Sequence, residues 1–136
     1  CSREKEPVMK LLRALVTTAI LAAAGTSAAE AFEFKAFDEA TVEAAIASGR
    51  PVVVHVFAPW CLQCRAQETI LKRLSSDTSY DGISFYRVDY DNQKDVVKDL
   101  GTPRSTLIAY NGGAEVAKMS WGTSTEAVVG VLDAAR

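Results

Sequence analysis

Near the middle of the chain the sequence reads Phe57-Ala58-Pro59-Trp60-Cys61-Leu62-Gln63-Cys64-Arg65. The run Val52–Phe57 consists of β-branched and aromatic residues broken only by His55, which is typical of a central strand buried on both faces. The residues after the turn contain no glycine or proline and place three apolar side chains on one helical face: Ile70, Leu71 and Leu74. We therefore expect both cysteines at the N-terminus of a helix.

The spacing of Cys61 and Cys64 has a chemical logic. At the start of a helix, the first cysteine faces unpaired backbone N–H groups and the positive end of the helix dipole, which favour its thiolate. The second cysteine lies one turn further on, close enough to attack a mixed disulfide formed by the first. A pair of structural thiols and half of a zinc site are the alternatives. His55 is the only histidine, so residues 32–136 cannot supply four Cys/His ligands.

Composition indicates one compact domain. The chain has 136 residues, of which 49% are apolar and 24% charged, as in ordinary globular proteins. Fifteen Lys and Arg against 17 Asp and Glu leave a net charge of −2, without the basic excess typical of nucleic-acid binding. We expect no nucleic-acid partner. Three cysteines are also too few for a disulfide-rich miniprotein.

Residues 9–31 have the pattern of a secretory signal peptide. Lys10 and Arg13 precede an apolar run at 14–25, and small residues follow up to Ala31. The run is shorter than the roughly 20 residues that span a bilayer as a helix. An uncleaved anchor and an ordinary buried helix are the alternatives.

We expect cleavage after Ala31, with Ala28 and Ala29 as alternative sites. Cleavage after Ala31 divides the chain into an upstream extension at 1–8, a signal peptide at 9–31 and one domain at 32–136. Cys1 is then absent from the mature protein, which is expected to be periplasmic or secreted. Such compartments are oxidising, so the state of the Cys61–Cys64 pair becomes a functional question.

Hydrophobic patterns and turn signals predict an alternating order of elements, β-α-β-α-β-α-β-β-α. This order is typical of an α/β fold with a mixed central sheet and helices on both faces. The Thr123/Glu126 pair forms a capping box for the last helix. Besides the central strand and its helix, the expected elements are an edge strand at 32–37, a helix at 39–48 capped by Asp38, a strand at 83–90, a helix at 93–100, and a hairpin of strands 106–110 and 115–120.

The segment Phe57–Arg65, the strand that starts at Ser105-Thr106-Leu107-Ile108 and the Asn111-Gly112-Gly113 turn resemble the thioredoxin family over residues 32–136. The resemblance implies a thioredoxin-like fold and cofactor-free thiol–disulfide exchange with protein thiols and disulfides. It makes Cys61 the exposed nucleophile, Cys64 the buried resolving thiol and Trp60 an aromatic wall of the substrate surface. Plain packing is the alternative for Trp60, and Pro59 shapes the turn.

Two strand positions depart from the family pattern. His55 stands where the family usually has a buried acid, so either a neutral imidazole accepts the proton of Cys64 or His55 is a core histidine without a catalytic part. Arg87 stands where lysine is frequent. Its charge would favour a thiolate, or it serves as an ion-pair partner, with Asp89 and Asp91 as nearby candidates.

A third departure lies opposite the cysteines, where the family has a cis-proline before a threonine. Here Ser105 precedes Thr106, and Pro103 lies two residues too early. We interpret Pro103 as unrelated to the family's proline; a shifted alignment is the alternative. A cis bond before serine would cost roughly 3 kcal/mol, so we expect a trans Arg104–Ser105 bond. Ser105 and Thr106 are the expected substrate-binding residues, while Trp121 and Gly122 either border the same groove or pack in a loop.

These observations favour a monomeric envelope reductase or thiol carrier that depends on a membrane or envelope redox partner. The competing function is a non-enzymatic module that holds a metal, an iron–sulfur cluster or a client peptide at the Cys61/Cys64 pair. No metal site is assigned to other residues.

Overall fold

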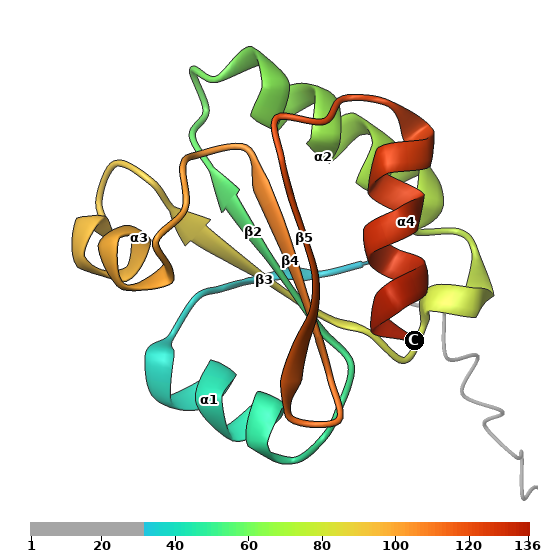
Figure 1. Cartoon of the computed structure of the whole chain (residues 1–136). Helices are drawn as coiled ribbons and strands as arrows, with labels where there is room; N and C mark the ends of the chain where they lie inside the picture. The colour runs from blue at the N-terminus through green and yellow to red at the C-terminus, as the bar shows by residue number, and fades with distance from the viewer. Residues whose placement is uncertain (1–31) are drawn as a thin grey trace, which may run out of the picture.

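The computed structural model describes residues 32–136 (Figure 1). The predicted element order is confirmed, with one additional short 3-10 helix, η2. The predicted signal peptide and upstream extension lie outside the described residues. The elements are β1 (Phe34–Ala36), α1 (Glu39–Ala47), β2 (Val52–Phe57), α2 (Leu62–Leu74), η2 (Thr78–Tyr80), β3 (Ser84–Asp89), α3 (Lys94–Leu100), β4 (Thr106–Asn111), β5 (Ala114–Ser120) and α4 (Thr125–Ala135).

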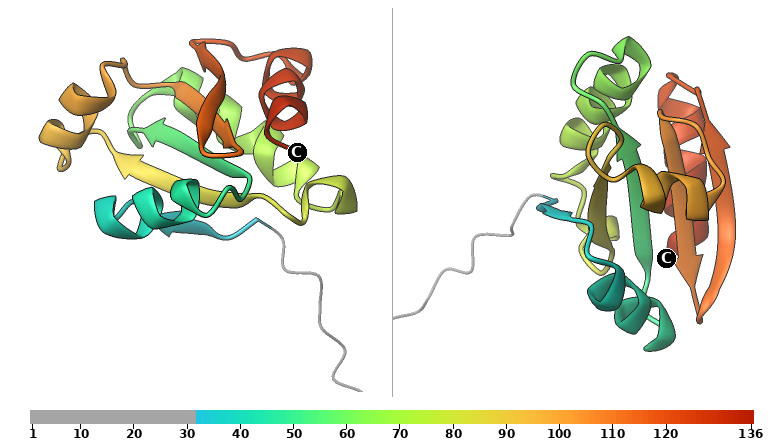
Figure 2. Two further views of the ribbon diagram at one scale, coloured as in Figure 1. Left: turned by 60° about the horizontal axis from the view of Figure 1, so that its bottom comes forward. Right: turned by 90° about the vertical axis from the view of Figure 1, so that its left-hand side faces the viewer.

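The five strands form one mixed sheet in the order β1-β3-β2-β4-β5. Strand β3 runs parallel to both β1 and β2, whereas β4 runs antiparallel to β2 and β5. Helices α1 and α3 cover one face of the sheet, and α2 and α4 cover the other (Figures 1 and 2). The expected mixed α/β sheet with helices on both faces is therefore confirmed.

Strand β2 is apolar apart from His55 because both of its faces are buried. Val52, Val54 and Val56 pack in the core under α1 and α3, whereas Val53 packs in the core under α2 and α4. Successive side chains of a strand point to opposite faces. His55 shares the face of Val53, so it points into the layer that holds α2.

The ends of the helices are set by short local contacts. Asp38 caps α1, as predicted, by accepting from the backbone N–H of Thr41. Helix α3 ends at Gly101, whose left-handed backbone (φ 62°) suits glycine. The Thr123/Glu126 capping box is wrong by one residue, because Ser124 is the residue with extended backbone and its hydroxyl accepts from Ala127 N–H at 3.1 Å.

No helix within residues 32–136 has both the length and the apolar character needed to cross a membrane.

Candidate active site

The two cysteines of the pair are joined as a disulfide at the start of α2. Cys61 is the N-cap of the helix, with extended backbone, and Cys64 lies in the first turn. Their Cα atoms are 5.3 Å apart, and the backbone N–H of Cys64 donates to the Cys61 sulfur at 3.2 Å. The expected position at a helix N-terminus is confirmed. In the reduced protein this donor and the helix dipole favour negative charge on Cys61.

Both cysteines are buried in this oxidised form. Cys61 keeps 2% of its surface exposed and Cys64 none, and Ala58, Phe57 and Tyr90 pack around them. The expectation that Cys61 is exposed is therefore wrong for the disulfide state. The physical reason is the packing of Phe57, Ala58 and Tyr90 around the pair, together with the N-cap position, which turns the Cys61 sulfur toward the backbone of α2.

His55 is completely buried and forms one end of a hydrogen-bonded chain. Its Nε2 lies 3.0 Å from Oε1 of Gln67. The amide nitrogen of Gln67 donates to the carbonyl oxygens of Ser105, at 3.0 Å, and Gly122, at 2.9 Å. Carbonyl oxygens only accept, so the oxygen of Gln67 faces His55 and the hydrogen resides on His55 Nε2. His55 Nδ1 is then a lone pair, and it has no partner within residues 32–136.

Burial is the main reason that the pKa of His55 is lowered to about 4. The positive charge of Arg87 acts in the same direction, while the hydrogen bond to Gln67 and the charge of Glu68 oppose it. An imidazole with this pKa is neutral at pH 7. The neutral form agrees with the single hydrogen that the Gln67 contact assigns to the ring.

This pKa predicts how stability changes with pH. The folded His55 binds a proton only near pH 4, whereas an unfolded histidine binds one near its ordinary pKa of 6.5, so protons favour the unfolded chain between these values. The contribution is fully present above pH 6.5 and is lost as the pH falls to 4, a decrease of about 3 kcal/mol in the free energy of unfolding. Urea unfolding across this range measures it.

His55→Gln is the matched control for that measurement, because glutamine does not titrate and its amide can still donate to Gln67. The difference between wild type and variant isolates His55 from the carboxylates. If both proteins lose stability equally between pH 6.5 and 4, His55 is not buried in the neutral form.

Arg87 lies beside His55 on the neighbouring strand β3. Its guanidinium carbon lies 4.4 Å from the centre of the Phe34 ring and 4.1 Å from that of Phe57. Its Nη2 forms an ion pair with Glu68 Oε1 of α2 at 3.0 Å. Burial alone would raise the pKa of Glu68, but the hydrogen bonds and charges of Arg87 and Lys72 together outweigh it, so this pKa is lowered.

The predicted ion-pair partners of Arg87 are therefore wrong. The carboxylate of Asp89 accepts from the backbone N–H groups of Asp91 and Asn92 and closes the turn after β3. The carboxylate of Asp91 accepts from the indole Nε1 of Trp60 at 2.9 Å. Both acids are engaged locally, so the guanidinium runs between the two aromatic rings to α2 instead.

Ser105 lies next to the disulfide. Its backbone N–H donates to the carbonyl oxygen of Val56 at 2.9 Å, and the same oxygen lies 3.9 Å from the Cys64 sulfur. The described backbone contains no cis peptide bond, so the expected trans Arg104–Ser105 bond is confirmed. Ser105 has a left-handed backbone (φ 59°), which few residues other than glycine adopt and which functional loops often contain.

Thr106 follows Ser105 as the first residue of β4. Its hydroxyl donates to the carbonyl of Pro103 at 2.9 Å and lies 2.8 Å from the hydroxyl of Ser120. Thr106 and Ser105 are both fully buried. Their side chains are therefore not exposed at the surface of this form.

The surface beside the disulfide is aromatic. Trp60 is 56% exposed and Trp121 is 42% exposed. The backbone N–H of Trp121 donates to the Ser105 carbonyl at 2.8 Å. This hydrogen bond holds the end of β5 beside the loop that contains Ser105. Pro59 lies in the turn between β2 and α2, closed by a hydrogen bond from Cys61 N–H to the Ala58 carbonyl at 3.1 Å.

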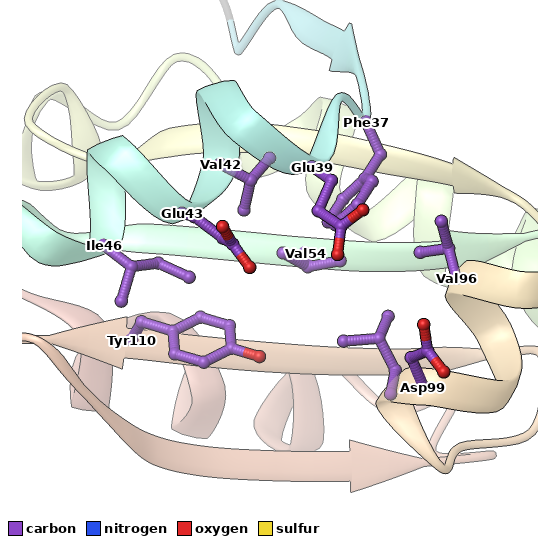
Figure 3. Close-up of a pocket in the computed structure, with 10 residues that line it drawn as sticks. Phe37, Glu39, Val42, Glu43, Ile46, Val54, Val96, Asp99 and Tyr110 are labelled. Atoms are coloured by element: carbon purple, nitrogen blue, oxygen red, sulfur yellow. The ribbon is translucent and has the colours of Figure 1, made fainter.

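A cavity of about 250 Å³ lies elsewhere, between α1 and α3 (Figure 3). Val54 and Tyr110 line it together with carboxylates of Glu39, Glu43 and Asp99. Val54 points to the sheet face opposite His55, so this cavity is separate from the disulfide. Within residues 32–136 no group of three or more His, Cys, Asp or Glu side chains is arranged to hold a metal ion.

Gln67 and Glu68 are the functional-site residues that sequence reasoning missed. The burial of Gln67 could have been predicted from the sequence, because it is a polar residue on the same helical stripe as Ile70, Leu71 and Leu74. A polar side chain at a core position of a helix needs a buried partner. Glu68 carried no such signal, since it is one of several charged residues on α2.

The mixed sheet with a redox-active cysteine pair at the N-terminus of α2 defines a thiol–disulfide oxidoreductase. The Thioredoxin family model matches residues 33–134, and the chain belongs to this family.

Curated relatives agree with this assignment. The chain is 34% identical to Thioredoxin-2 of Saccharomyces cerevisiae over 79 residues, which cover 57% of this chain and 74% of that protein. It is 34% identical to the thiol:disulfide interchange protein CycY of Rhizobium leguminosarum bv. viciae over 100 residues, covering 72% of this chain but only 52% of CycY.

Solved structures agree as well. The crystal structure of Trxlp from Edwardsiella tarda EIB202 superposes with a TM-score of 0.69 at 33% identity, covering 74% of this chain and 98% of that one.

Proposed function

We propose that the chain is a reductase or thiol carrier that exchanges its Cys61–Cys64 couple with protein disulfides in the cell envelope. The observation that carries the proposal is the N-cap position of Cys61, whose sulfur accepts the Cys64 N–H at 3.2 Å. In the reduced chain this environment stabilises a Cys61 thiolate, the species that attacks disulfides.

Reduction of a client proceeds in two exchanges. The Cys61 thiolate attacks one sulfur of the client disulfide, and the other client sulfur leaves as a thiolate that takes up a proton. Cys64 then loses its proton and attacks the Cys61 sulfur, which releases the second client thiolate. Two electrons pass to the client, and the chain ends as the Cys61–Cys64 disulfide. A membrane or envelope redox partner returns two electrons in each cycle.

The envelope location rests on the signal-peptide pattern of residues 9–31. Similarity to a protein named for thiol:disulfide interchange supports the exchange reaction, not the location. A monomer suffices for the reaction, since β2, α2 and the facing loop at Ser105 all come from one chain.

His55 is the proposed acceptor of the Cys64 proton. Its support is the buried Nδ1 lone pair, without a partner in the described residues, on the α2 side of β2. A pKa of about 4 makes a weak base, so we expect a modest contribution. His55→Gln should slow release of the client from the mixed disulfide about tenfold and leave attack by Cys61 unchanged. Equal release rates would make His55 a core histidine only.

The reduction potential of the Cys61–Cys64 couple tests the direction of electron flow. We expect a value near that of thioredoxin, about −270 mV. The chain is equilibrated with dithiothreitol or glutathione buffers, and its free thiols are alkylated and counted by mass spectrometry. A potential near about −120 mV would identify an oxidant of folding proteins instead. A couple that never forms a disulfide, with stoichiometric metal in the purified protein, would favour the metal-binding alternative.

A further inference from the structure

A guanidinium group lies between two exposed indole rings beside the disulfide. The Arg104 guanidinium carbon is 4.8 Å from the ring centre of Trp60 and 5.0 Å from that of Trp121. We call these three residues the Trp–Arg–Trp cluster. They come from three separate loops, after β2, before β4 and after β5, which emerge at the same end of the sheet (Figure 1).

The cluster borders the reacting sulfurs through covalent neighbours. Trp60 directly precedes Cys61, and Arg104 directly precedes Ser105, whose N–H shares the Val56 carbonyl with the Cys64 sulfur. A client whose disulfide reaches Cys61 therefore lies against this cluster.

The charge of Arg104 is not neutralised within the described chain. None of the four ion pairs formed by residues 32–136 involves Arg104, and its Nε is buried without a hydrogen-bond partner there. The carboxylate of Asp91 contacts the cluster by accepting a hydrogen bond from the indole N–H of Trp60. A buried N–H donor without a partner is costly, and a guanidinium suits a carboxylate because it can donate two parallel hydrogen bonds.

The indoles hold Arg104 in place. Contact of a cation with two aromatic faces restrains its side chain, so less conformational entropy is lost when it binds a carboxylate. The rings also exclude water from one side of the contact, which strengthens the attraction.

We propose that the Trp–Arg–Trp cluster selects client disulfides that carry an acidic residue next to the attacked cysteine. The carboxylate pairs with Arg104 while the client backbone crosses the exposed indoles. The proposal rests on the exchange with protein disulfides described above and adds the class of client.

The test uses three synthetic peptides, each with one intramolecular disulfide, that differ only in having Glu, Gln or Lys beside the attacked cysteine. The full chain is reduced with dithiothreitol, freed of it, and mixed with each peptide in a single turnover. The same peptides reacted with dithiothreitol alone give their intrinsic reactivity, by which each rate constant is divided.

We expect the wild type to reduce the Glu peptide about fivefold faster than the Gln peptide, which is the rate ratio that one partly exposed ion pair would give. The Lys peptide should be reduced most slowly. Arg104→Gln should bring the Glu/Gln ratio close to one. Arg104→Lys should retain part of the preference. Arg73→Gln removes the same charge at the far end of α2 and should leave the ratio unchanged.

Equal wild-type rates on all three peptides would overturn the proposal and leave the exchange function intact. An Arg104→Gln variant that slows all peptides by one factor would also overturn it, because Arg104 would then only shape the site. If the reduced chain attacks none of the peptides and does not reduce insulin, the exchange function itself fails.

Discussion

The Cys61→Ala variant is expected to lose at least about 1,000-fold of the rate of disulfide reduction, because the remaining thiol, Cys64, is fully buried and has no second cysteine with which to complete the exchange. Insulin reduction with dithiothreitol as electron donor measures this rate. The variant is made with Cys1 replaced by serine, so that Cys61 and Cys64 are the only thiols of the reference protein. Turnover at the wild-type rate would rule out the proposed mechanism.

Cys64→Ala is the matched control, since it removes the same disulfide and the same side-chain atoms. It keeps the attacking sulfur and loses the resolving one, so it should accumulate a mixed disulfide between Cys61 and the client, visible by mass spectrometry. Both variants lose the cross-link, which lowers stability by about 2 kcal/mol, so their circular dichroism is compared first. If Cys61→Ala traps clients and Cys64→Ala does not, the two roles are exchanged.

Gln67→Met is expected to lower the free energy of unfolding by about 3 kcal/mol, the largest effect on stability among the variants considered. Methionine has a similar length but cannot replace the three hydrogen bonds of Gln67 to His55, Ser105 and Gly122. The change leaves a buried imidazole N–H without its acceptor, and such unsatisfied groups are costly. Urea unfolding of the oxidised protein at pH 7 measures the loss.

Gln63→Met is the control for this substitution. It makes the same change on the same helix at an exposed position, where surface substitutions usually alter stability by less than about 0.5 kcal/mol. Similar losses in both variants would mean that the effect comes from placing methionine in α2, not from the buried contacts of Gln67.

The architecture was predictable because its signals are local. The apolar run of β2, the turn at Pro59 and the apolar stripe of α2 are read within windows of a few residues, and the element order they indicate is confirmed. The helix N-terminus around Cys61 follows from the same windows, and so does the backbone N–H of Cys64 that faces the Cys61 sulfur.

The contacts of the site were not predictable in this way. Arg87 pairs with Glu68 rather than with acids near it in sequence, because the local acids close their own turn or hold an indole. Gln67 joins residues 12, 38 and 55 positions away in the chain. The wrong N-cap residue for α4 has a local cause. Thr123 and Ser124 are adjacent hydroxyl residues that could both cap the helix, and only the backbone geometry selects Ser124.

Local sequence was sufficient for the fold class, for the dithiol chemistry and for the strand that carries His55, because periodicity and spacing act through neighbouring residues. Tertiary structure decided the ring hydrogen of His55, the burial of Cys61 and the place of Arg104 between two indoles. Each of these depends on side chains from separate strands, helices or loops that meet only when the chain folds around a sheet with the order β1-β3-β2-β4-β5. No short window of sequence contains both partners of such a contact.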